Sequence, residues 1–281
     1  MKNYMSKKKS VKVVVALTCF NRREKTLNCV KKLISENKNV LFEFVIVDDN
    51  SSDGTVAALN ELQENITIIQ SEGNLFYSRG MRRAMEVVQN EEKYKEDNYI
   101  LLVNDDVDFY SNSIENIINE SKGKYVIVGA TCNSKGIQSY GAVRYPKKNS
   151  VKAEKILVGD KKRADTFNAN CVLIPMETFK EVGIMDSHYI HGLGDYDYGF
   201  AISKHGYEIY SSSEYVGKCD NNSLKNTWLD KTLSIKTRIR KKESVKGSPA
   251  KIWWYYLKKN FGLFQAIKYS ISPYVKILLK K

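Results

Sequence analysis

The chain has 281 residues, of which 42% are hydrophobic and 27% charged, and its formal net charge is +13. This length is sufficient for one large domain, or one domain with an appendage. No apolar run approaches the roughly 20 residues of a membrane-spanning helix. The five cysteines form neither a close pair of metal-site spacing nor an even disulfide framework. We therefore expect reduced thiols in a cytoplasmic protein.

All of the excess positive charge lies in the last fifth of the chain. Residues 224–281 contain 15 Lys and Arg against Asp230 and Glu243, whereas residues 1–223 contain equal numbers of basic and acidic residues. This asymmetry predicts a boundary near residue 223, between a first domain over residues 1–223 and a basic tail over residues 224–281.

The N-terminal segment has two interpretations. Lys7–Lys9 followed by Val13–Leu17 is similar to a short signal peptide. However, no small-x-small cleavage site follows, and the polar run Asn21–Glu24 comes at once. A first buried strand is the favoured interpretation.

Predicted strands and helices alternate over the first half of the chain. Strands are predicted over residues 11–18, 41–47, 66–69, 100–103 and 125–128, and helices over residues 24–35, 56–62, 78–88 and 114–119. Strands separated by helices of this length form a doubly wound, mostly parallel sheet with right-handed connections. The predicted fold class is therefore α/β, of Rossmann-like type.

The pattern changes after Gly129. Strands of a small, partly antiparallel layer are predicted over residues 136–145 and 151–158, a buried strand over residues 167–174, helices over residues 175–182 and 195–204, and short closing strands over residues 207–210 and 214–216. In the tail, residues 252–277 are predicted to form one or two amphipathic helices, broken near Gly262 and Pro273. We therefore expect a small antiparallel layer beside the main sheet and a C-terminal helical appendage.

An acidic cluster follows the predicted strand Ile100–Val103. It consists of Asn104, Asp105, Asp106 and, after one valine, Asp108. Carboxylates crowded at the end of a buried strand repel one another, so a cation should neutralise them. Mg²⁺ or Mn²⁺ suits one or two carboxylates together with the oxygens of a substrate phosphate. The alternative is a solvated acidic turn that caps the next helix. Ligands bind at the carboxyl ends of strands in open parallel sheets, which favours the cation site.

A second acidic turn, Asp48–Thr55, follows the second predicted strand. It could be a turn with a capped helix, or its carboxylates could accept hydrogen bonds from a nucleotide base or from ribose hydroxyls. The chain has neither a GxGxxG motif after the first strand nor a GxxxxGK[ST] motif. A dinucleotide cofactor and a P-loop nucleotidase are therefore disfavoured.

Two further segments carry groups suited to catalysis. Arg79 follows the turn Gly73-Asn74 and shares a helix face with other arginines, which indicates either a solvated basic face or a diphosphate contact. Asp195 begins a predicted helix, and it could be an N-cap or a general base that removes a proton from an acceptor hydroxyl. His191, beside the glycine-containing loop before Asp195, could contact a ligand.

Together these motifs resemble family-two inverting glycosyltransferases of the GT-A fold, in the bacterial polysaccharide branch with rhamnosyl- and galactosyltransferase-like enzymes. The resemblance covers roughly residues 11–220. It implies that the first loop and the acidic turn hold the nucleotide, that Asp106 ends a DxD-type signature and binds metal and diphosphate, and that Asp195 is the catalytic base of the acceptor motif. The expected nucleotide-sugar site comprises Thr18, Phe20, Asn21, Arg22, Asp48, Asp49, Ser51, Asp53, Gly73, Asn74, Arg79, Asn104 and Asp105, with Gly194, Asp197 and His191 on the acceptor side.

The sequence departs from the family pattern at three positions. Asn104 stands where many relatives have aspartate, Gly194 where many have glutamate, and Ala201 where many have arginine. The first departure weakens a metal site without abolishing it. The other two mean that contacts to the acceptor cannot be carried over residue by residue.

The expected function is that of an inverting glycosyltransferase assisted by Mg²⁺ or Mn²⁺. The expected donor is a nucleoside-diphosphate sugar, with UDP or dTDP as nucleotide, and the expected acceptor is a hydroxyl of a lipid-linked intermediate or a polysaccharide, such as capsule or another cell-surface glycan. One alternative is a sugar-phosphate nucleotidyltransferase, although residues 19–22 are not the Gly-rich basic loop that it would need. The other is a non-catalytic basic protein that binds membrane or nucleic acid.

The basic tail combines lysines with aromatic residues, which suits an anionic membrane surface. Nucleic-acid phosphates would suit the same lysines, but no nucleic-acid-binding motif accompanies them, so no nucleic acid is expected. A third possibility is a helical appendage whose aromatic residues pack on the catalytic domain. We expect the protein to be peripheral on the inner face of the plasma membrane.

Overall fold

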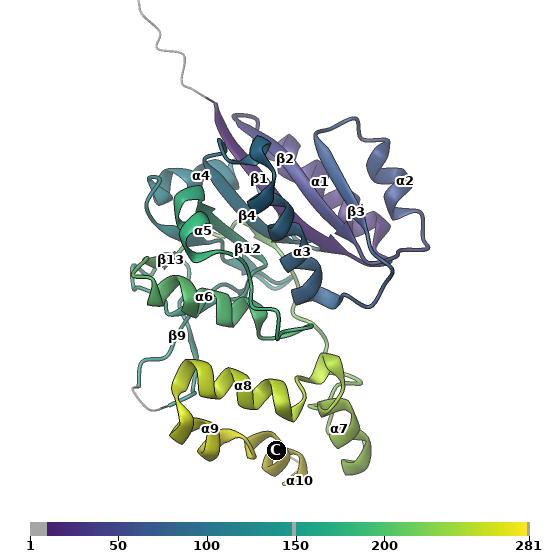
Figure 1. Ribbon diagram of the computed structural model, residues 1–281, viewed down its shortest axis with the longest axis vertical. Helices are drawn as coiled ribbons and strands as arrows, with labels where there is room; N and C mark the ends of the chain where they lie inside the picture. The colour runs from purple at the N-terminus through teal and green to yellow at the C-terminus, as the bar shows by residue number, and fades with distance from the viewer. Residues whose placement is uncertain (1–9, 148–149, 280–281) are drawn as a thin grey trace, which may run out of the picture.

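The computed structural model describes residues 10–147 and 150–279. An α/β layer occupies the upper part of Figure 1, and a layer of helices from the C-terminal tail lies below it. Lys7–Lys9, which suggested a signal peptide, lie outside the described residues.

The α/β layer is built on a seven-stranded sheet. Its strands are β1 (Val11–Cys19), β2 (Val40–Asp48), β3 (Ile66–Gln70), β4 (Tyr99–Asn104), β6 (Val126–Val128), β12 (Cys171–Pro175) and β13 (Ile209–Ser211). The strand order is β13-β6-β12-β4-β1-β2-β3. All neighbours are parallel except β12, which is antiparallel to both β4 and β6. The mostly parallel sheet confirms the prediction.

Helices cover both faces of this sheet. They are α1 (Arg23–Glu36), α2 (Thr55–Asn60), α3 (Phe76–Asn90), α4 (Ser113–Ser121), α5 (Met176–Val182) and α6 (Gly194–Lys204), with a 3-10 turn, η1, at Glu92–Tyr94. Helices α3, α5 and α6 belong to one apolar core, and α1, α2 and α4 to the other. Because both faces are covered, β1 is fully buried from Val13 to Leu17, as its continuous apolar sequence predicts.

Two small sheets complete the α/β layer. One contains β5 (Asp108–Phe109), β7 (Thr131–Cys132), β8 (Gln138–Tyr140) and β14 (Gly217–Lys218), and the other contains β9 (Ala142–Arg144), β10 (Glu154–Lys155) and β11 (Thr166–Phe167). The predicted single strand over residues 136–145 is wrong, because the chain turns at Gly141 and divides it between the two sheets. The predicted strand over residues 167–174 is likewise two strands, separated by Asn168–Asn170.

The tail forms more helices than predicted. They are α7 (Ile235–Lys242), α8 (Ala250–Phe261), α9 (Leu263–Tyr269) and α10 (Ser272–Leu278), with a 3-10 turn, η2, at Val245–Gly247. The predicted break at Gly262 is present, with φ at +88°. The predicted break near Pro273 is also present: α9 ends at Tyr269 and α10 begins at Ser272, with Pro273 in its first turn, where the missing N–H has no helical partner to lose. Within the described residues, no helix is long and apolar enough to cross a membrane.

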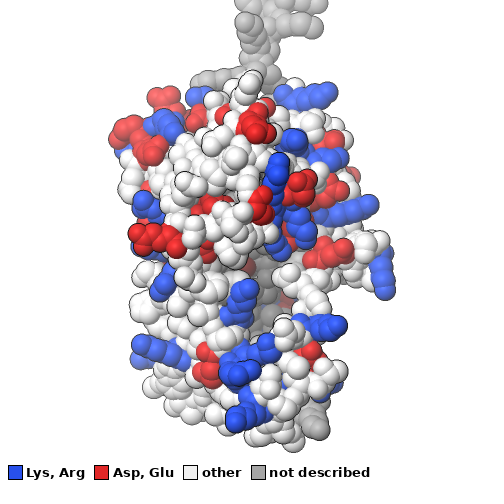
Figure 2. Space-filling model, turned by 90° about the vertical axis from the view of Figure 1, so that its right-hand side faces the viewer, with Lys and Arg blue, Asp and Glu red and all other residues white. Residues whose placement is uncertain are grey.

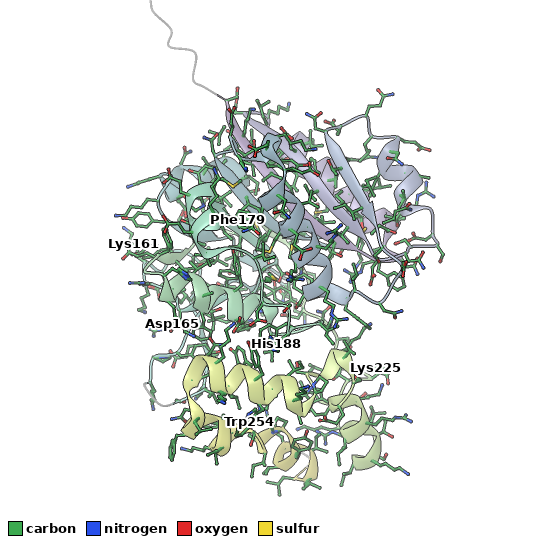
Figure 3. All side chains as sticks on the ribbon, in the orientation of Figure 1. Lys161, Asp165, Phe179, His188, Lys225 and Trp254 are labelled. Carbon is green, nitrogen blue, oxygen red and sulfur yellow. The ribbon has the colours of Figure 1, made fainter. Side chains whose placement is uncertain are left out.

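Helix α8 holds the tail against the α/β layer. Lys259 contacts Asp186 and Asp197 at 2.6 Å each, and the Asn260 side chain donates to Asp197 at 2.7 Å. The ring of His188, between the two layers in Figure 3, stacks on Tyr255 with centroids 4.1 Å apart. The tail therefore packs on the α/β layer through α8, one of the alternatives that the sequence left open.

Candidate active site

The acidic cluster lies where β4 ends, and its charge is balanced by an arginine from the first loop. The Arg22 guanidinium lies 2.6 Å from Asp105 Oδ1 and 3.2 Å from Asp106 Oδ2. Thr26 donates to the other oxygen of Asp105 at 3.3 Å. Burial raises the pKa of Asp105, and Arg22 only partly offsets this effect. Part of the expected neutralisation therefore comes from the guanidinium of Arg22.

Asp106 and Asp108 are the members of the cluster that face open space, whereas Asp105 is buried. The Asp106 side chain is 17% exposed and lines a pocket of about 330 Å³, together with Arg22, Lys25 and Asp108. The alternative of a helix-capping acidic turn is wrong, because α4 has Asn112 at its N-cap position and Asp108 belongs to β5. The pocket combines cationic side chains with an accessible carboxylate, a set that suits a diphosphate.

The side chains that could act as metal ligands limit the kind of metal site that could form at Asp106. No group of three His, Cys, Asp or Glu side chains in the described part of the chain could hold a metal ion. A site made of protein ligands alone is therefore not supported. The exposed carboxylate of Asp106 fits a Mg²⁺ or Mn²⁺ ion that takes its remaining ligands from phosphate oxygens and water. Asn104 Oδ1 is buried without a hydrogen-bond partner in the described structure.

The first two carboxylates of the turn after β2 are used inside the protein. Asp48 is fully buried and accepts a hydrogen bond from Ser51 N at 2.8 Å. Asp49 accepts hydrogen bonds from Leu75 N at 2.9 Å and Phe76 N at 3.0 Å, so it caps α3 from outside the helix. These two residues hold the loops around the site in place. Because their carboxylates are buried and hydrogen-bonded within the protein, few acceptor positions remain for a nucleotide.

The other predicted nucleotide-binding residues of the two loops interlock. Asn21 N donates to Ser51 Oγ at 2.9 Å, and Ser52 N donates to Asn21 Oδ1 at 2.8 Å. Asp53 accepts from Arg23 N at 2.9 Å at the start of α1. Phe20 is 54% exposed beside them, so its ring is free to stack on a planar ligand.

Thr18 and the turn Gly73-Asn74 position the start of α3. Thr18 Oγ1 donates to Val47 O at 3.1 Å. A Cβ on Gly80 of α3 would lie 2.3 Å from that hydroxyl, so only glycine allows α3 to approach β1 this closely. Gly73 and Asn74 both have positive φ, at +96° and +67°, which produces the tight turn before the helix.

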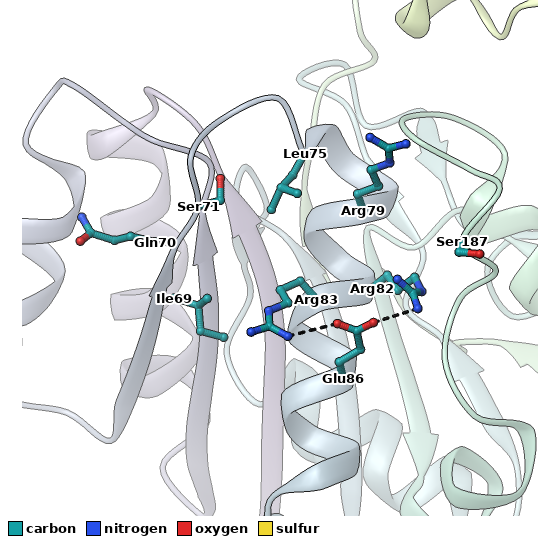
Figure 4. Close-up of a pocket in the computed structure, with 9 residues that line it drawn as sticks. All are labelled: Ile69, Gln70, Ser71, Leu75, Arg79, Arg82, Arg83, Glu86 and Ser187. Carbon is teal, nitrogen blue, oxygen red and sulfur yellow. Dashed lines mark hydrogen bonds and ion pairs between the residues drawn. The ribbon is translucent and has the colours of Figure 1, made fainter.

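Arg79 lines a second pocket, of about 460 Å³, beside α3 (Figure 4). Arg82 and Arg83 lie in the same pocket, and both pair with Glu86, at 2.9 and 3.3 Å. The residues that line this pocket do not include the acidic cluster or Asp195. The structure therefore places Arg79 in a pocket other than the one that Asp106 lines.

Asp195 lies in the first turn of α6. It accepts hydrogen bonds from Ala169 N at 3.2 Å and from Tyr196 N at 2.9 Å. Burial raises its pKa to about 6, and these hydrogen bonds oppose the shift. Gly194 is packed so closely that a Cβ would lie 2.5 Å from Ser78 Oγ. A side chain at this position would therefore fit only if Ser78 moved.

Asn168–Asn170, the segment between β11 and β12, links Asp195 to Asp106. Ala169 N donates to Asp195, and the next residue, Asn170, donates to Cys219 Sγ at 3.5 Å. The Cys219 thiol in turn lies 3.5 Å from Asp106 Oδ1. The two predicted functional carboxylates therefore lie on either side of one three-residue segment.

The charged carboxylates beside this segment raise the pKa values of nearby tyrosine hydroxyls. Burial raises the pKa of Tyr77 well above its usual value, and the charges of Asp195 and Asp106 raise it further. Tyr196, whose hydroxyl accepts from Asn168 Nδ2 at 3.1 Å, also has a raised pKa, from burial and from Asp195. The sequence does not predict that these carboxylates have Tyr77, Asn168, Asn170 and Cys219 as neighbours, because no spacing in the sequence brings these residues together.

Two predicted acceptor-side residues have different surroundings. Asp197 is 2% exposed, and the tail and Tyr189 occupy its carboxylate, so the expected contact with an acceptor is not available in this structure. His191 lies edge-on to Phe76, with ring centroids 6.1 Å apart, and its Nδ1 is buried without a partner in the described structure. Burial lowers the pKa of His191, so the ring is neutral at neutral pH.

Residues 14–182 match the model of glycosyl transferase family 2. The chain belongs to this family. This membership supports a glycosyltransferase and favours it over the nucleotidyltransferase and the non-catalytic binding protein that the sequence had left as alternatives. A search of the curated proteins found no match.

Comparison with solved structures supports the GT-A fold. The mannosyltransferase PcManGT from Pyrobaculum calidifontis, in complex with GDP-Man and Mn²⁺, has a TM-score of 0.57 and 13% identity over 96% of this chain and 74% of its own. TarS from S. aureus has a TM-score of 0.56 and 13% identity over 90% of this chain, which spans 44% of the TarS chain. TarS residues 1–349 in complex with UDP-GlcNAc give 0.56 and 12% over 95% of this chain and 81% of that one.

Proposed function

We propose that this glycosyltransferase inverts the anomeric configuration, and that Asp195 is the general base that activates the acceptor hydroxyl. The supporting observation is the placement of Asp195 and Asp106 on either side of Asn168–Asn170. Asp106 lines the pocket suited to a diphosphate, and Asp195 is a desolvated carboxylate connected to Asp106 through Ala169, Asn170 and Cys219. A sugar bound across this segment would have its leaving group on the Asp106 side and the incoming alcohol on the Asp195 side.

The donor is a nucleoside-diphosphate sugar, with UDP or dTDP as the nucleotide. PcManGT binds GDP-Man and TarS binds UDP-GlcNAc, which supports this class of donor without selecting the base. Phe20 is placed to stack on the base, and Arg22 and Lys25 to pair with the phosphates. Asp106 would hold Mg²⁺ or Mn²⁺, which when bound supplies charge neutralisation for the departing diphosphate.

In the proposed reaction the acceptor O–H gives its proton to Asp195. The acceptor oxygen forms a bond to the anomeric carbon as the bond between that carbon and the phosphate oxygen breaks. The electron pair of the broken bond leaves with the nucleoside diphosphate, where Arg22 stabilises the negative charge. Because attack and departure occur on opposite faces, the configuration inverts. The proposed acceptor is a hydroxyl of a lipid-linked intermediate or of a glycan.

Replacement of the proposed base provides the main test. Asp195→Asn preserves the size of the side chain and should lower sugar transfer by about 10²–10⁴-fold, the range for loss of a general base. Binding of the donor, measured by calorimetry with a panel of UDP-, GDP- and dTDP-sugars, should be unchanged. Asp160→Asn, an exposed carboxylate away from the cleft, is the matched control. Near-normal transfer by Asp195→Asn would refute the base assignment.

A further inference from the structure

The last two helices present an apolar face that nothing in the described structure covers. Its members are Leu263, Phe264, Ile267, Ile271, Val275 and Leu278, whose exposed fractions lie between 44% and 74%. Leu263 and Ile267 lie four residues apart on one side of α9, Val275 and Leu278 lie three residues apart on one side of α10, and Ile271 lies in the turn that joins the two helices. We call these six residues the apolar face.

The opposite side of the same helices is firmly attached to the rest of the tail. Ala266 and Ile277 are fully buried. Trp253 Nε1 donates to Tyr269 O at 3.1 Å, and Arg238, itself 1% exposed, donates to Ile277 O at 3.2 Å. These contacts fix which side of α9 and α10 faces outward, so the exposure of the apolar face is a built feature of the tail.

The surroundings of the apolar face are basic. Lys268 and Lys276 lie exposed on α9 and α10, and Lys251 and Lys258 lie exposed on α8. Figure 2 shows lysine and arginine side chains gathered on the helical layer, with few acidic ones. Glu243 is one of the two acidic residues of the tail, and its carboxylate accepts hydrogen bonds from the N–H of Ala250 and the Tyr274 hydroxyl. The unpartnered surface is therefore both apolar and cationic.

We propose that α9 and α10 dock on an anionic phospholipid bilayer, with the apolar face in the boundary between headgroups and acyl chains. Lys268 and Lys276 would then lie among the headgroup phosphates. This pairing of an apolar face with flanking lysines is typical of helices that lie in the plane of a membrane. A second copy of the chain fits less well, because two strongly positive tails repel each other. A nucleic acid would satisfy the lysines but leave the apolar face in water.

Docking in this way would orient the catalytic cleft toward the membrane. In Figure 1, α9 and α10 lie on the far side of α8 from the sheet, and β1 runs toward the tail. The carboxyl ends of the parallel strands, where Asp106 lies, therefore face the bilayer side of the molecule. The docking itself does not depend on the proposed base or metal.

Flotation of the full chain with vesicles tests the proposal. We expect binding to an equimolar mixture of phosphatidylcholine and phosphatidylglycerol, and much weaker binding to phosphatidylcholine alone. Ile267→Asp combined with Ile271→Asp should abolish flotation. Ile137→Asp, which introduces the same charge at a residue 63% exposed outside the tail, should have no effect. Lys268→Gln and Lys276→Gln should each weaken binding about five-fold, the effect of one lysine near an anionic surface.

Two further measurements separate docking from its competitors. Donor hydrolysis and the melting temperature of each variant should match those of the unchanged chain, because none of these residues belongs to the cleft. Sedimentation should show a monomer whose mass is unaffected by Ile267→Asp. The proposal would be overturned if flotation were independent of lipid charge and unchanged in the apolar-face variants. So would a dimer that the same variants dissociate.

Discussion

Lys259 forms ion pairs that join the tail to the α/β layer, and its replacement is predicted to destabilise the protein. The ammonium of Lys259 lies 2.6 Å from carboxylate oxygens of both Asp186 and Asp197, and Asp197 is 2% exposed. Lys259→Met keeps an unbranched side chain that is one atom shorter and removes the charge. The variant would leave Asp197 buried beside an apolar group, which is far less favourable than a buried pair.

The size of the effect follows from the surroundings of the pair. Removal of one partner from a buried ion pair destabilises by about 3–5 kcal/mol. Lys259 is itself 33% exposed, and Asn260 and Tyr189 still donate to Asp197, so we expect about 2–3 kcal/mol. For a chain of this length, that lowers the melting temperature by about 4–10 °C.

The pH dependence of this effect has a definite sign. Burial alone would raise the pKa of Asp186, but hydrogen bonds from His188 N and Lys259 reverse the shift and hold this pKa below its usual range. A depressed carboxylate pKa stabilises the fold above the unfolded-state value and loses that contribution in acid. The difference in free energy of unfolding between the unchanged chain and Lys259→Met should therefore be largest near neutral pH. It should shrink as the pH falls below about 4.

Urea denaturation followed by tryptophan fluorescence is a direct assay, because all three tryptophans lie in the tail. Lys258→Met, which changes the exposed neighbour, is the control and should leave the midpoint unaltered. Asp197→Asn added to Lys259→Met should recover part of the loss, since the buried charge is then gone. Equal midpoints for Lys258→Met and Lys259→Met would refute the reasoning.

Three other predictions concern the cleft. Transfer by the unchanged chain should rise with pH and level off above about 6, because Asp195, whose pKa burial raises to about 6, must be ionised to act as a base; a pH profile of kcat/KM that stays flat through pH 6 would contradict this. Asp106→Ala, or EDTA, should suppress donor turnover and abolish any dependence of donor binding on Mn²⁺ in calorimetry, whereas full metal-free activity would exclude the proposed role. Asp49→Ala should leave the N–H groups of Leu75 and Phe76 unpaired and lower stability by about 1–3 kcal/mol for each, as measured by urea denaturation. Asp53→Ala, on the exposed side of the same turn, should have a smaller effect.

The sequence by itself determined the sheet and the general location of the site. Apolar runs such as Val13–Leu17 and Ile100–Val103 are too short for helices and too uniform for a half-exposed strand, so both had to be buried on two faces. The carboxylates that follow such strands must lie at one edge of the sheet, because parallel strands end together. Local patterns of this kind are enough to place Asp106 at that edge. Asp195 begins a helix after a loop, so only the family resemblance assigned it to the same site.

Tertiary structure alone decided the roles of the individual carboxylates. Asp48, Asp49 and Asp106 look alike in the sequence, yet the first two are used within the protein and only Asp106 faces the pocket. The partners that make this distinction are remote: Arg22 lies 83 positions from Asp105, and Lys259 lies 62 positions from Asp197. Pairings over such distances leave no periodic trace in a single sequence.

The same reason explains the direction of β12 and the position of the tail. The apolar sequence of β12 specifies burial, but a buried strand has the same composition whether it runs parallel or antiparallel to β4. The basic and aromatic residues of the tail show that it must bury one side. Asp186 and Asp197 of the α/β layer decided which side α8 buries, and contacts from Trp253 and Arg238 decided which side of α9 and α10 stays exposed.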